Sequence, residues 1–223
     1  ISINPNKVSY DLLKGMTDAI AHRGPDGDGH WISENGCIGL GHRRLSIIDL
    51  SHDADQPMYY LDRYTIVFNG EIYNYIELKE TLLQQGYTFK TQSDTEVLLA
   101  LYDRDKEKCL PLLDGMFAFV LYDKKDNTIF CARDRFGEKP FFYSYEKGKH
   151  FYFGSEMKCL WAAGVSDEVS NKMLFNYLAY GFVENEKDSS ETFYSKSTRL
   201  PHAHYLKINP ETLEISIHRY YDI

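Results

Sequence analysis

The stretch YTIVFNGEIYNYIELKETLLQQG, residues 64–86, places an Asn-Gly pair between a strand signal and a helix signal. Its first five residues form a short apolar and aromatic run of the kind that is typical of a strand. Asn74 and Glu77 have the spacing of a capping box, which predicts that a helix begins there. An Asn-Gly pair commonly forms the turn of a β-hairpin, but here a helix follows it. Asn69 and Gly70 therefore form either a turn or a pair of groups that faces a ligand.

The rest of the sequence predicts several helices among many strands, most of which are joined by hairpins. The expected helices are Asn6–Ala21, one that starts at Asn74, one that starts at Ser93 in a second capping box with Glu96, Glu156–Ala163 and Ser170–Tyr180. The expected strands are His30–Ser33, Cys37–His42, Tyr64–Phe68, Tyr87–Lys90, Met116–Asp123, Thr128–Arg133, Phe141–Tyr145, His150–Ser155, Ala203–Ile208 and Glu214–His218. Strands and helices mixed in this way indicate an α+β sandwich.

The composition is that of an ordinary globular protein with an acidic balance. The 223 residues are 43% apolar and 26% charged and carry a net charge of -8, so nucleic acids and anionic membranes are poor partners. No stretch reaches the ~20 apolar residues of a membrane span. Cys37, Cys109, Cys131 and Cys159 are far apart, which favours reduced, buried thiols over disulfides. We expect a cytoplasmic protein without a nucleic-acid or membrane partner.

Four polar loop sequences lie at or near predicted strand ends, where binding groups often gather: HRGPDG, HRRLSIID, FNGEIYN and SDTEV. Together they would supply an Arg, an Asp and the Asn-Gly pair. A free amino acid offers a carboxylate, which suits the guanidinium of Arg44, and an ammonium, which suits the carboxylate of Asp94. Hydrolysis of an amide develops an oxyanion, which the Asn69 side chain and the Gly70 backbone N–H could stabilise.

Eight motifs then occur in a fixed order: HRGPDGDG, HRRLSIIDL, DQP, NGEIYN, SDTEV, DGMFAFVLYD, RDRFGEKPFFY and SEMKCL. This order resembles that of the glutamine-hydrolysing domain of asparagine synthetases. That family belongs to the class II glutamine amidotransferases, which are N-terminal nucleophile hydrolases. The resemblance runs from His22 to the end of the chain. It implies that residues 1–223 form one glutamine amidotransferase type-2 domain, a four-layer αββα sandwich that hydrolyses glutamine to glutamate and ammonia.

The resemblance also implies what lies outside this domain. The ammonia would serve the ATP-dependent conversion of aspartate to asparagine in a separate C-terminal synthetase domain, whose phosphate loop has no counterpart here. No cofactor and no metal are therefore expected in this domain, and ATP and Mg only in the synthetase domain. The implied partners are glutamine and the synthetase domain, and a homodimer is compatible with them.

Carried over residue by residue, the resemblance assigns a complete glutamine site. Arg44 would hold the α-carboxylate, with the backbone of Leu45, Ser46, Ile47 and Ile48 beside it. Asp94, helped by Glu71, would hold the α-ammonium, and Asn69 and Gly70 would form the oxyanion hole. His22–Gly27 would shape the wall near the nucleophile, with Arg23 as an orienting hydrogen-bond donor. Arg133–Pro140 would line the side that faces the synthetase domain.

The nucleophile of this family is a Cys at the mature N-terminus, and its free α-amino group, with a pKa of ~7.7–8, acts as the base. Ile1-Ser2-Ile3 resembles the end of the first strand in that family, so the Cys is expected a few residues upstream. None of the four internal cysteines has a free α-amino group. The chain as written is therefore expected to be catalytically inactive.

Less specific interpretations remain for several of these residues. Arg44 could be a surface charge, and Asp94 could simply favour a helix start. His202 and His204 have the spacing of metal ligands on a strand, but no third ligand lies near them in sequence. The charges of Arg133–Lys139 could form a structural ion-pair network. The whole chain could also be a non-catalytic glutamine-sensing or docking module, or an amidotransferase domain that serves a different acceptor.

Overall fold

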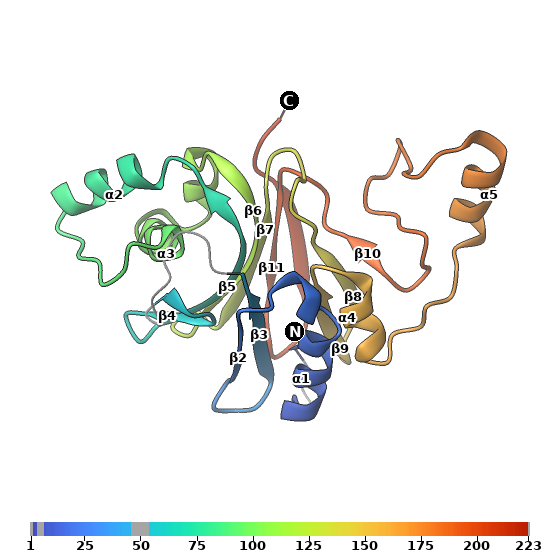
Figure 1. Ribbon diagram of the computed structural model, residues 1–223, viewed down its shortest axis with the longest axis horizontal. Coiled ribbons are helices and arrows are strands. Elements are labelled where there is room, and N and C mark those ends of the chain that lie inside the picture. Colours follow the sequence, from blue (N-terminus) through green and yellow to red (C-terminus); the bar gives the residue numbers. More distant parts are fainter. Residues whose placement is uncertain (1, 4–6, 46–53, 223) are drawn as a thin grey trace.

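Two six-stranded sheets lie face to face in the centre of the molecule (Figure 1). The computed structural model describes residues 2–3, 7–45 and 54–222. In spatial order, the first sheet contains β10 (Thr198–Arg199), β8 (Phe142–Glu146), β9 (His150–Gly154), β1 (Ser2–Ile3), β3 (Ile38–Arg44) and β2 (Gly27–Ile32). The second contains β12 (Ile215–Arg219), β11 (His204–Ile208), β7 (Thr128–Arg133), β6 (Gly115–Asp123), β5 (Tyr64–Ile72) and β4 (Met58–Tyr60). All strand pairs within these sheets are antiparallel.

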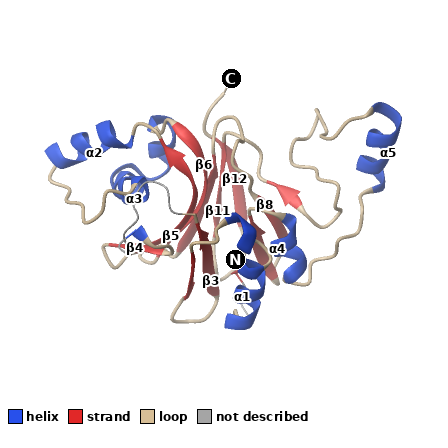
Figure 2. Cartoon of the chain, viewed as in Figure 1, coloured by secondary structure: helices blue, strands red, loops and turns tan. Residues whose placement is uncertain are grey.

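Helices cover the outer faces of both sheets, which gives four layers (Figure 2). On the first sheet lie α1 (Tyr10–Asp18) and α4 (Met157–Ala162), and on the second lie α2 (Tyr75–Gln84), α3 (Asp94–Asp105) and the 3-10 helix η3 (Lys106–Leu112). A short 3-10 helix, η1 (Ala21–Arg23), follows α1, and α5 (Asn171–Tyr180) stands apart from the layers (Figure 1). The predicted four-layer αββα sandwich is confirmed.

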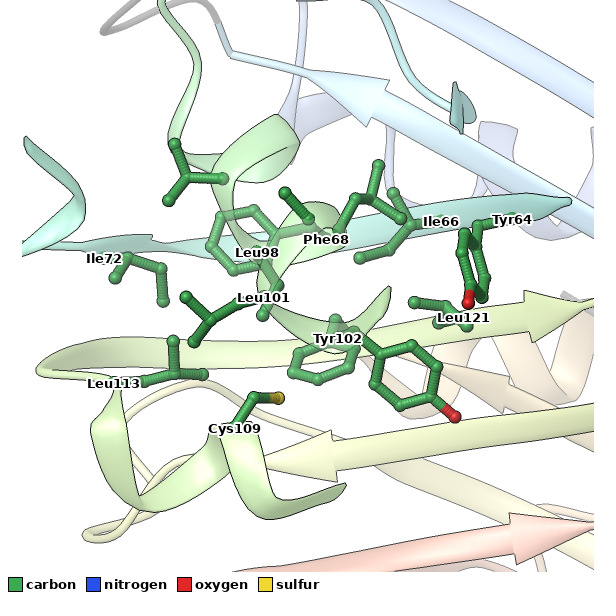
Figure 3. Packing of buried hydrophobic residues seen from close by; sticks show 14 of the residues in the cluster. Tyr64, Ile66, Phe68, Ile72, Leu98, Leu101, Tyr102, Cys109, Leu113 and Leu121 are labelled. Atoms are coloured by element: carbon green, nitrogen blue, oxygen red, sulfur yellow. The ribbon is translucent and has the colours of Figure 1, made fainter. Parts of the chain in front are cut away.

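Strand β6 divides the hydrophobic core because its side chains alternate between two faces. Phe117, Phe119 and Leu121 pack toward α3, in the cluster that Figure 3 shows around Leu98, Leu101 and Tyr102. Ala118, Val120 and Tyr122 pack between the sheets, against residues such as Leu40 and Phe153 of the first sheet. The sequence signal for this strand was a continuous apolar run, as expected for a strand that is buried on both faces.

The predicted helix starts at Asn74 and Ser93 are confirmed, but the capping boxes are wrong. Ser93 caps α3 by accepting a hydrogen bond from Thr95 N at 3.1 Å. Glu96 accepts instead from Lys90 N and Thr91 N, at 2.9 and 2.7 Å. The Asn74 side chain makes no cap bond and instead links to the backbone of η3 and β6, through Leu112 O and Asp114 N.

Several predicted boundaries also change. Tyr87–Lys90 is not a strand, because the Glu96 carboxylate takes backbone donors that a ladder would need. The first helix is shorter than Asn6–Ala21, since Ser9 caps it by accepting from Leu12 N. Strand β2 begins at Gly27, inside the glycine-rich loop. The short elements β4, β10 and η3 carried no signal that we recognised.

In the described part of the chain, none of the four cysteines forms a disulfide. Cys109, Cys131 and Cys159 are buried, whereas Cys37 is half-buried. The prediction of thiols outside disulfides is therefore confirmed, and that of burial holds for three of the four. Within the described ranges, no helix is long and apolar enough to cross a membrane.

Asp123, the last residue of β6, is a buried carboxylate that ties the second sheet to the end of α3. It is 1% exposed and accepts hydrogen bonds from Arg63 Nε at 2.7 Å and Lys106 Nζ at 2.9 Å. Burial alone would raise the pKa of Asp123, but the hydrogen bonds outweigh it and lower the pKa to about 2.

The variant Asp123→Asn should lower the free energy of unfolding by about 2 kcal/mol at pH 7. Because the folded-state pKa lies below the ordinary value of 3.8, the contribution is complete above that value and is lost as the pH falls toward 2. Urea denaturation of both proteins between pH 7 and pH 2 measures the difference. A difference that does not change with pH would contradict the assigned ion pairs.

Candidate functional site

One cavity of about 300 Å³ opens where the ends of β3, β5 and β9 meet the N-terminus of α3. Its size suits a small ligand. It is lined by every described residue to which a role in binding glutamine was assigned: Arg44, Leu45, Asn69, Gly70, Glu71 and Asp94. Ser46, Ile47 and Ile48 lie outside the described residues. The loops that the sequence placed at strand ends therefore converge on one site.

Asp94 is the first residue of α3 and is 5% exposed. Its Oδ2 accepts a hydrogen bond from Ile72 N at 2.9 Å. Burial raises the pKa of Asp94, the hydrogen bonds with Ile72 and Thr95 oppose the rise, and the nearby Glu71 carboxylate adds to it. In the described part of the chain, Asp94 forms no ion pair. A buried carboxylate without a cation is costly unless a ligand supplies the positive charge.

The backbone N–H and C=O groups of successive β5 residues point alternately to the two edges of the strand. This alternation determines where the Gly70 N–H points. Arg63 O accepts from Lys124 N at 2.9 Å and Tyr73 N donates to Asp114 O at 2.7 Å, so odd-numbered residues of β5 face β6. Even-numbered residues face the opposite edge. Gly70 is even-numbered, so its N–H points away from β6. Asn69-Gly70 is therefore not a turn, because the strand continues straight through it to Ile72.

That opposite edge of β5 borders the cavity. Phe68 N donates to Gln56 Oε1 at 2.6 Å, and Ile72 N donates to Asp94 Oδ2. The Gly70 N–H lies between these two occupied donors and beyond the last β4 pair, Met58 with Ile66. This edge thus presents a backbone donor to a cavity that also contains a buried carboxylate.

Asn69 projects from β5 toward the first sheet. Its neighbour two positions earlier, Val67, packs between the sheets, and side chains two apart share a face of a strand. Asn69 Nδ2 donates to Ser155 Oγ, just after β9, in a long hydrogen bond of 3.4 Å. The Asn69 side-chain donor and the Gly70 backbone donor therefore line the same cavity from adjacent residues.

Arg44 ends β3 and lines the cavity with its guanidinium, which forms an ion pair with Asp55. The neighbouring His42 also lines the cavity, and burial lowers its pKa to about 4, with a smaller contribution from the Arg44 charge. The imidazole is therefore neutral at pH 7. Arg44 can offer a fork of N–H donors to a ligand carboxylate. Arg43 also lines the cavity, and its guanidinium forms ion pairs with Asp18 and Asp28.

The HRGPDG motif contributes Arg23 to the cavity lining. Arg23 donates from Nη1 to Glu156 Oε1 at 3.3 Å, and His22 Nε2 lies 2.9 Å from the same oxygen. Burial favours a raised pKa for Glu156, but the hydrogen bonds with His22 and Arg23 outweigh it, so the pKa is lowered. Glu156 therefore holds Arg23 beside the cavity.

The first two residues of the segment Arg133–Pro140, Arg133 and Asp134, are both buried. Arg133 Nε donates to Lys139 O at 2.7 Å, and its Nη atoms donate to the carbonyls of Leu200 and Gly137. Asp134 is 1% exposed and accepts from backbone amides of the loop. Their partners are thus backbone groups, so the interpretation as an ion-pair network is wrong for these two residues. Lys139 and Pro140 line the cavity.

A metal centre has no support within the described ranges, where no three His, Cys, Asp or Glu side chains are grouped as ligands. His204 Nδ1 lies 2.6 Å from the His202 carbonyl oxygen.

A family model described as a glutamine amidotransferase domain matches residues 2–221. The chain belongs to this glutamine amidotransferase family. An asparagine synthetase [glutamine-hydrolyzing] of Bacillus subtilis is 48% identical over 78% of this chain, which covers 27% of that protein. A putative asparagine synthetase of Methanocaldococcus jannaschii is 39% identical over 97% of this chain, which covers 44% of that protein. The amidotransferase chain therefore spans less than half the length of either relative.

The fold of the amidotransferase chain also matches a solved structure. Glutamine phosphoribosylpyrophosphate amidotransferase from B. subtilis superimposes with a TM-score of 0.71 at 19% identity. The match covers 99% of this chain and 48% of that one. At this identity the match supports the N-terminal nucleophile hydrolase fold alone.

The structure adds cavity residues of the amidotransferase domain that the sequence analysis did not assign. Gln56 occupies one backbone donor of β5, Ser155 accepts a hydrogen bond from the Asn69 amide, and Lys139 also lines the cavity. All three lie within the ordered motifs DQP, SEMKCL and RDRFGEKPFFY. Motif membership was therefore the signal available, but only the tertiary structure shows which motif residues face the cavity.

The amidotransferase variant Gly70→Ala should lower the free energy of unfolding by at least about 2 kcal/mol, because it overpacks the β5–β6 pair. A Cβ at this position would clash with the Met116 carbonyl oxygen and lie 2.7 Å from Phe117 Cα, both of which are backbone atoms. Thermal and urea denaturation measure the loss.

The control is Gly15→Ala in α1, where an added Cβ has no atom within 4 Å. This change should stabilise the protein by about 0.5–1 kcal/mol, because Ala favours a helix interior more than Gly does. If Gly70→Ala were as stable as the parent, the close approach of β5 to β6 would not be the reason for glycine here.

Proposed function

We propose that this cavity binds glutamine and hydrolyses its side-chain amide to glutamate and ammonia. The observation that carries the proposal is Asp94, a buried carboxylate with no cation partner among the described residues, at the end of a cavity that also holds Arg44. A buried anion and a guanidinium fork at one site match the ammonium and carboxylate of a free amino acid.

In this proposal Asp94 pairs with the α-ammonium of glutamine, and Glu71 adds negative potential beside it. Arg44 holds the α-carboxylate, and Leu45 supports the same wall. Ser46, Ile47 and Ile48 are proposed to continue this wall, although they lie outside the described residues. The amino acid head would then be fixed at one end of the cavity, with the side-chain amide directed toward Asn69 and Gly70.

Asn69 Nδ2 and the Gly70 N–H are proposed to form the oxyanion hole. Both are hydrogen-bond donors from adjacent residues of one rigid strand, so they need little reorganisation when negative charge develops on the amide oxygen. The long 3.4 Å bond from Asn69 to Ser155 is one that a developing oxyanion can replace. Loss of such a donor typically lowers turnover by ~10²–10³-fold.

The nucleophile is proposed to be a cysteine thiolate upstream of β1. Strand β1 lies between β3 and β9, and Ser2 pairs with Tyr152. Continued in this antiparallel register, a residue about three positions upstream of Ser2 would face Ser155. Ser155 lines the cavity and contacts Asn69. An upstream extension of β1 would therefore bring the chain that carries the cysteine toward the proposed oxyanion hole.

The reaction then proceeds in two steps. The α-amine takes the thiol proton, and the thiolate attacks the amide carbon of glutamine to form a C–S bond. The C–N bond then breaks as the resulting α-ammonium protonates the amide nitrogen, which leaves as ammonia. Water, deprotonated by the same amine, attacks the γ-glutamyl thioester, the C–S bond breaks, and glutamate and the thiolate are released. Cys37, Cys109, Cys131 and Cys159 cannot replace this group, because none has a free α-amine.

The ammonia is proposed to serve asparagine synthesis elsewhere in a longer protein. The relatives named above are asparagine synthetases, and they extend well beyond the region that this chain matches. A C-terminal synthetase domain that binds ATP and Mg and converts aspartate to asparagine is therefore the proposed partner. A different acceptor is the alternative for that step.

The variant Asp94→Asn should abolish measurable glutamine binding in isothermal titration calorimetry, while its Tm stays equal to or above that of the parent. Since burial raises the pKa of Asp94, ionisation of this group at pH 7 opposes folding, and removal of the charge relieves that opposition. In the parent, binding should weaken as the pH falls through the raised pKa of Asp94, because the protonated form cannot pair with an ammonium.

The matched control is Asp103→Asn, in the same helix. The Asp103 carboxylate accepts hydrogen bonds from the Tyr64 and Tyr87 hydroxyls and does not line the cavity. It should leave glutamine affinity unchanged. Equal affinities for Asp94→Asn and the parent would contradict the proposed role.

The intact protein should hydrolyse glutamine only with its native N-terminus. Mass spectrometry of that protein should place Cys-Gly-Ile directly before Ile1, and the 223-residue chain alone should bind glutamine without releasing ammonia. A Cys→Ser change at the native N-terminus is the control, and it should keep binding and abolish turnover. Another residue in the place of the cysteine would instead favour a non-catalytic glutamine-sensing or docking module.

A further inference from the structure

We infer that Asp134 is a positioning residue that fixes the proposed oxyanion strand and the cavity-lining segment Lys139–Phe141 relative to each other. It lies directly after β7 and is 1% exposed. Four backbone N–H groups donate to its carboxylate: Phe136 and Glu138 to Oδ1 at 3.0 and 2.9 Å, and Lys139 and Phe117 to Oδ2 at 2.9 and 3.3 Å. The inference rests on the function proposed above.

Asp134 extends the β6–β7 ladder by one residue. The last regular pair is Ala118 with Arg133, so the next would be Phe117 with Asp134. Asp134 N donates to Phe117 O at 2.8 Å, as a ladder residue would. Its own carbonyl accepts from Ala203 N instead. The side-chain carboxylate therefore replaces the missing carbonyl and accepts the Phe117 N–H.

The hydrogen bond from Phe117 N to the Asp134 carboxylate affects Gly70, because Gly70 lies opposite Phe117 in the β5–β6 pair. Because both backbone groups of Phe117 are bonded to Asp134, neither is turned toward β5. Gly70 is then a non-hydrogen-bonded partner, and its N–H remains directed toward the cavity edge. The carboxylate of Asp134 thus holds the β6 residue that fixes where the proposed oxyanion donor points.

The same carboxylate also positions the cavity-lining segment that begins at Lys139. Lys139 N donates to Asp134 Oδ2, and Lys139 O accepts from Arg133 Nε at 2.7 Å, so the Lys139 backbone is held on both sides. Lys139 and its neighbours Pro140 and Phe141 line the cavity. The buried pair Arg133 and Asp134 therefore holds both the β6 residue opposite Gly70 and the cavity-lining segment that begins at Lys139.

The test compares Asp134→Asn with Asp123→Asn in the intact protein with its native N-terminus. Both parent carboxylates are 1% exposed and flank the same two strands, and neither lines the cavity itself. Asp134 bonds the backbone of the cavity residue Lys139, whereas Asp123 lies at the far end of β6. Asp134→Asn should lower kcat for glutamine hydrolysis by on the order of 10²-fold. Its glutamine Kd should remain within about threefold of the parent's, since Asp134 touches no substrate. Asp123→Asn should keep the parental kcat.

A second readout does not depend on activity. In ¹⁵N NMR spectra of the 223-residue chain, Asp134→Asn should shift the Gly70 backbone and Asn69 side-chain amide signals, and Asp123→Asn should leave both in place. If Asp134→Asn does not fold, Asp134→Glu, which keeps the charge but moves it by one methylene, provides the same comparison.

Parental kcat together with unshifted amide signals in a folded Asp134 variant would overturn the inference. Equal losses in the two Asp→Asn variants would also overturn it, because they would indicate a general loss of stability. Failure of the parent to bind glutamine would contradict the proposed function instead, and the amide signals would then decide the role of Asp134.

Discussion

The alternation of backbone hydrogen bonds along β5 is the constraint on which the candidate site depends. Odd-numbered residues are bonded toward β6, so even-numbered residues must direct their N–H groups to the other edge. That edge meets Gln56, the cavity and Asp94 in succession. A shift of one residue in the β5–β6 register would turn the Gly70 N–H into the sheet and move the Asn69 side chain away from Ser155. The fold therefore specifies the site through strand register before any side chain is considered.

The sequence predicted the layers and the location of the site better than the individual contacts. The strand and helix patterns predicted an α+β sandwich, because long apolar runs such as Met116–Asp123 have few alternative placements. The family resemblance implied its four αββα layers. The sequence patterns failed at Tyr87–Lys90 and at both capping boxes. There, the Glu96 and Asn74 side chains accept hydrogen bonds from backbone N–H groups other than the predicted ones. The role of Asp134 could not be predicted either, because it depends on a ladder that forms only when β6 and β7 pair.

Three buried carboxylates of this chain have different hydrogen-bond and ion-pair partners, and these partners indicate a different role for each. Asp123 is paired with Arg63 and Lys106, which stabilises its charge and joins elements. Asp134 is satisfied by four backbone N–H groups, which fixes a loop and a strand. Asp94 accepts backbone hydrogen bonds but has no cation among the described residues, and burial raises its pKa. Of the three, Asp94 is the one whose environment improves when a cationic ligand arrives.

Such an arrangement links stability to function in a specific way. A carboxylate that must be buried and ionised to recognise an ammonium reduces the stability of the unliganded protein. The surrounding contacts fix the cavity lining: the β5–β6 pair allows no side chain at Gly70, and Arg133 and Asp134 hold the backbone of Lys139. A ligand cation that enters this cavity meets a carboxylate that has no ion-pair partner among the described residues and is already oriented by backbone hydrogen bonds. The free energy gained by neutralising Asp94 can then be used to orient the amide toward Asn69 and Gly70.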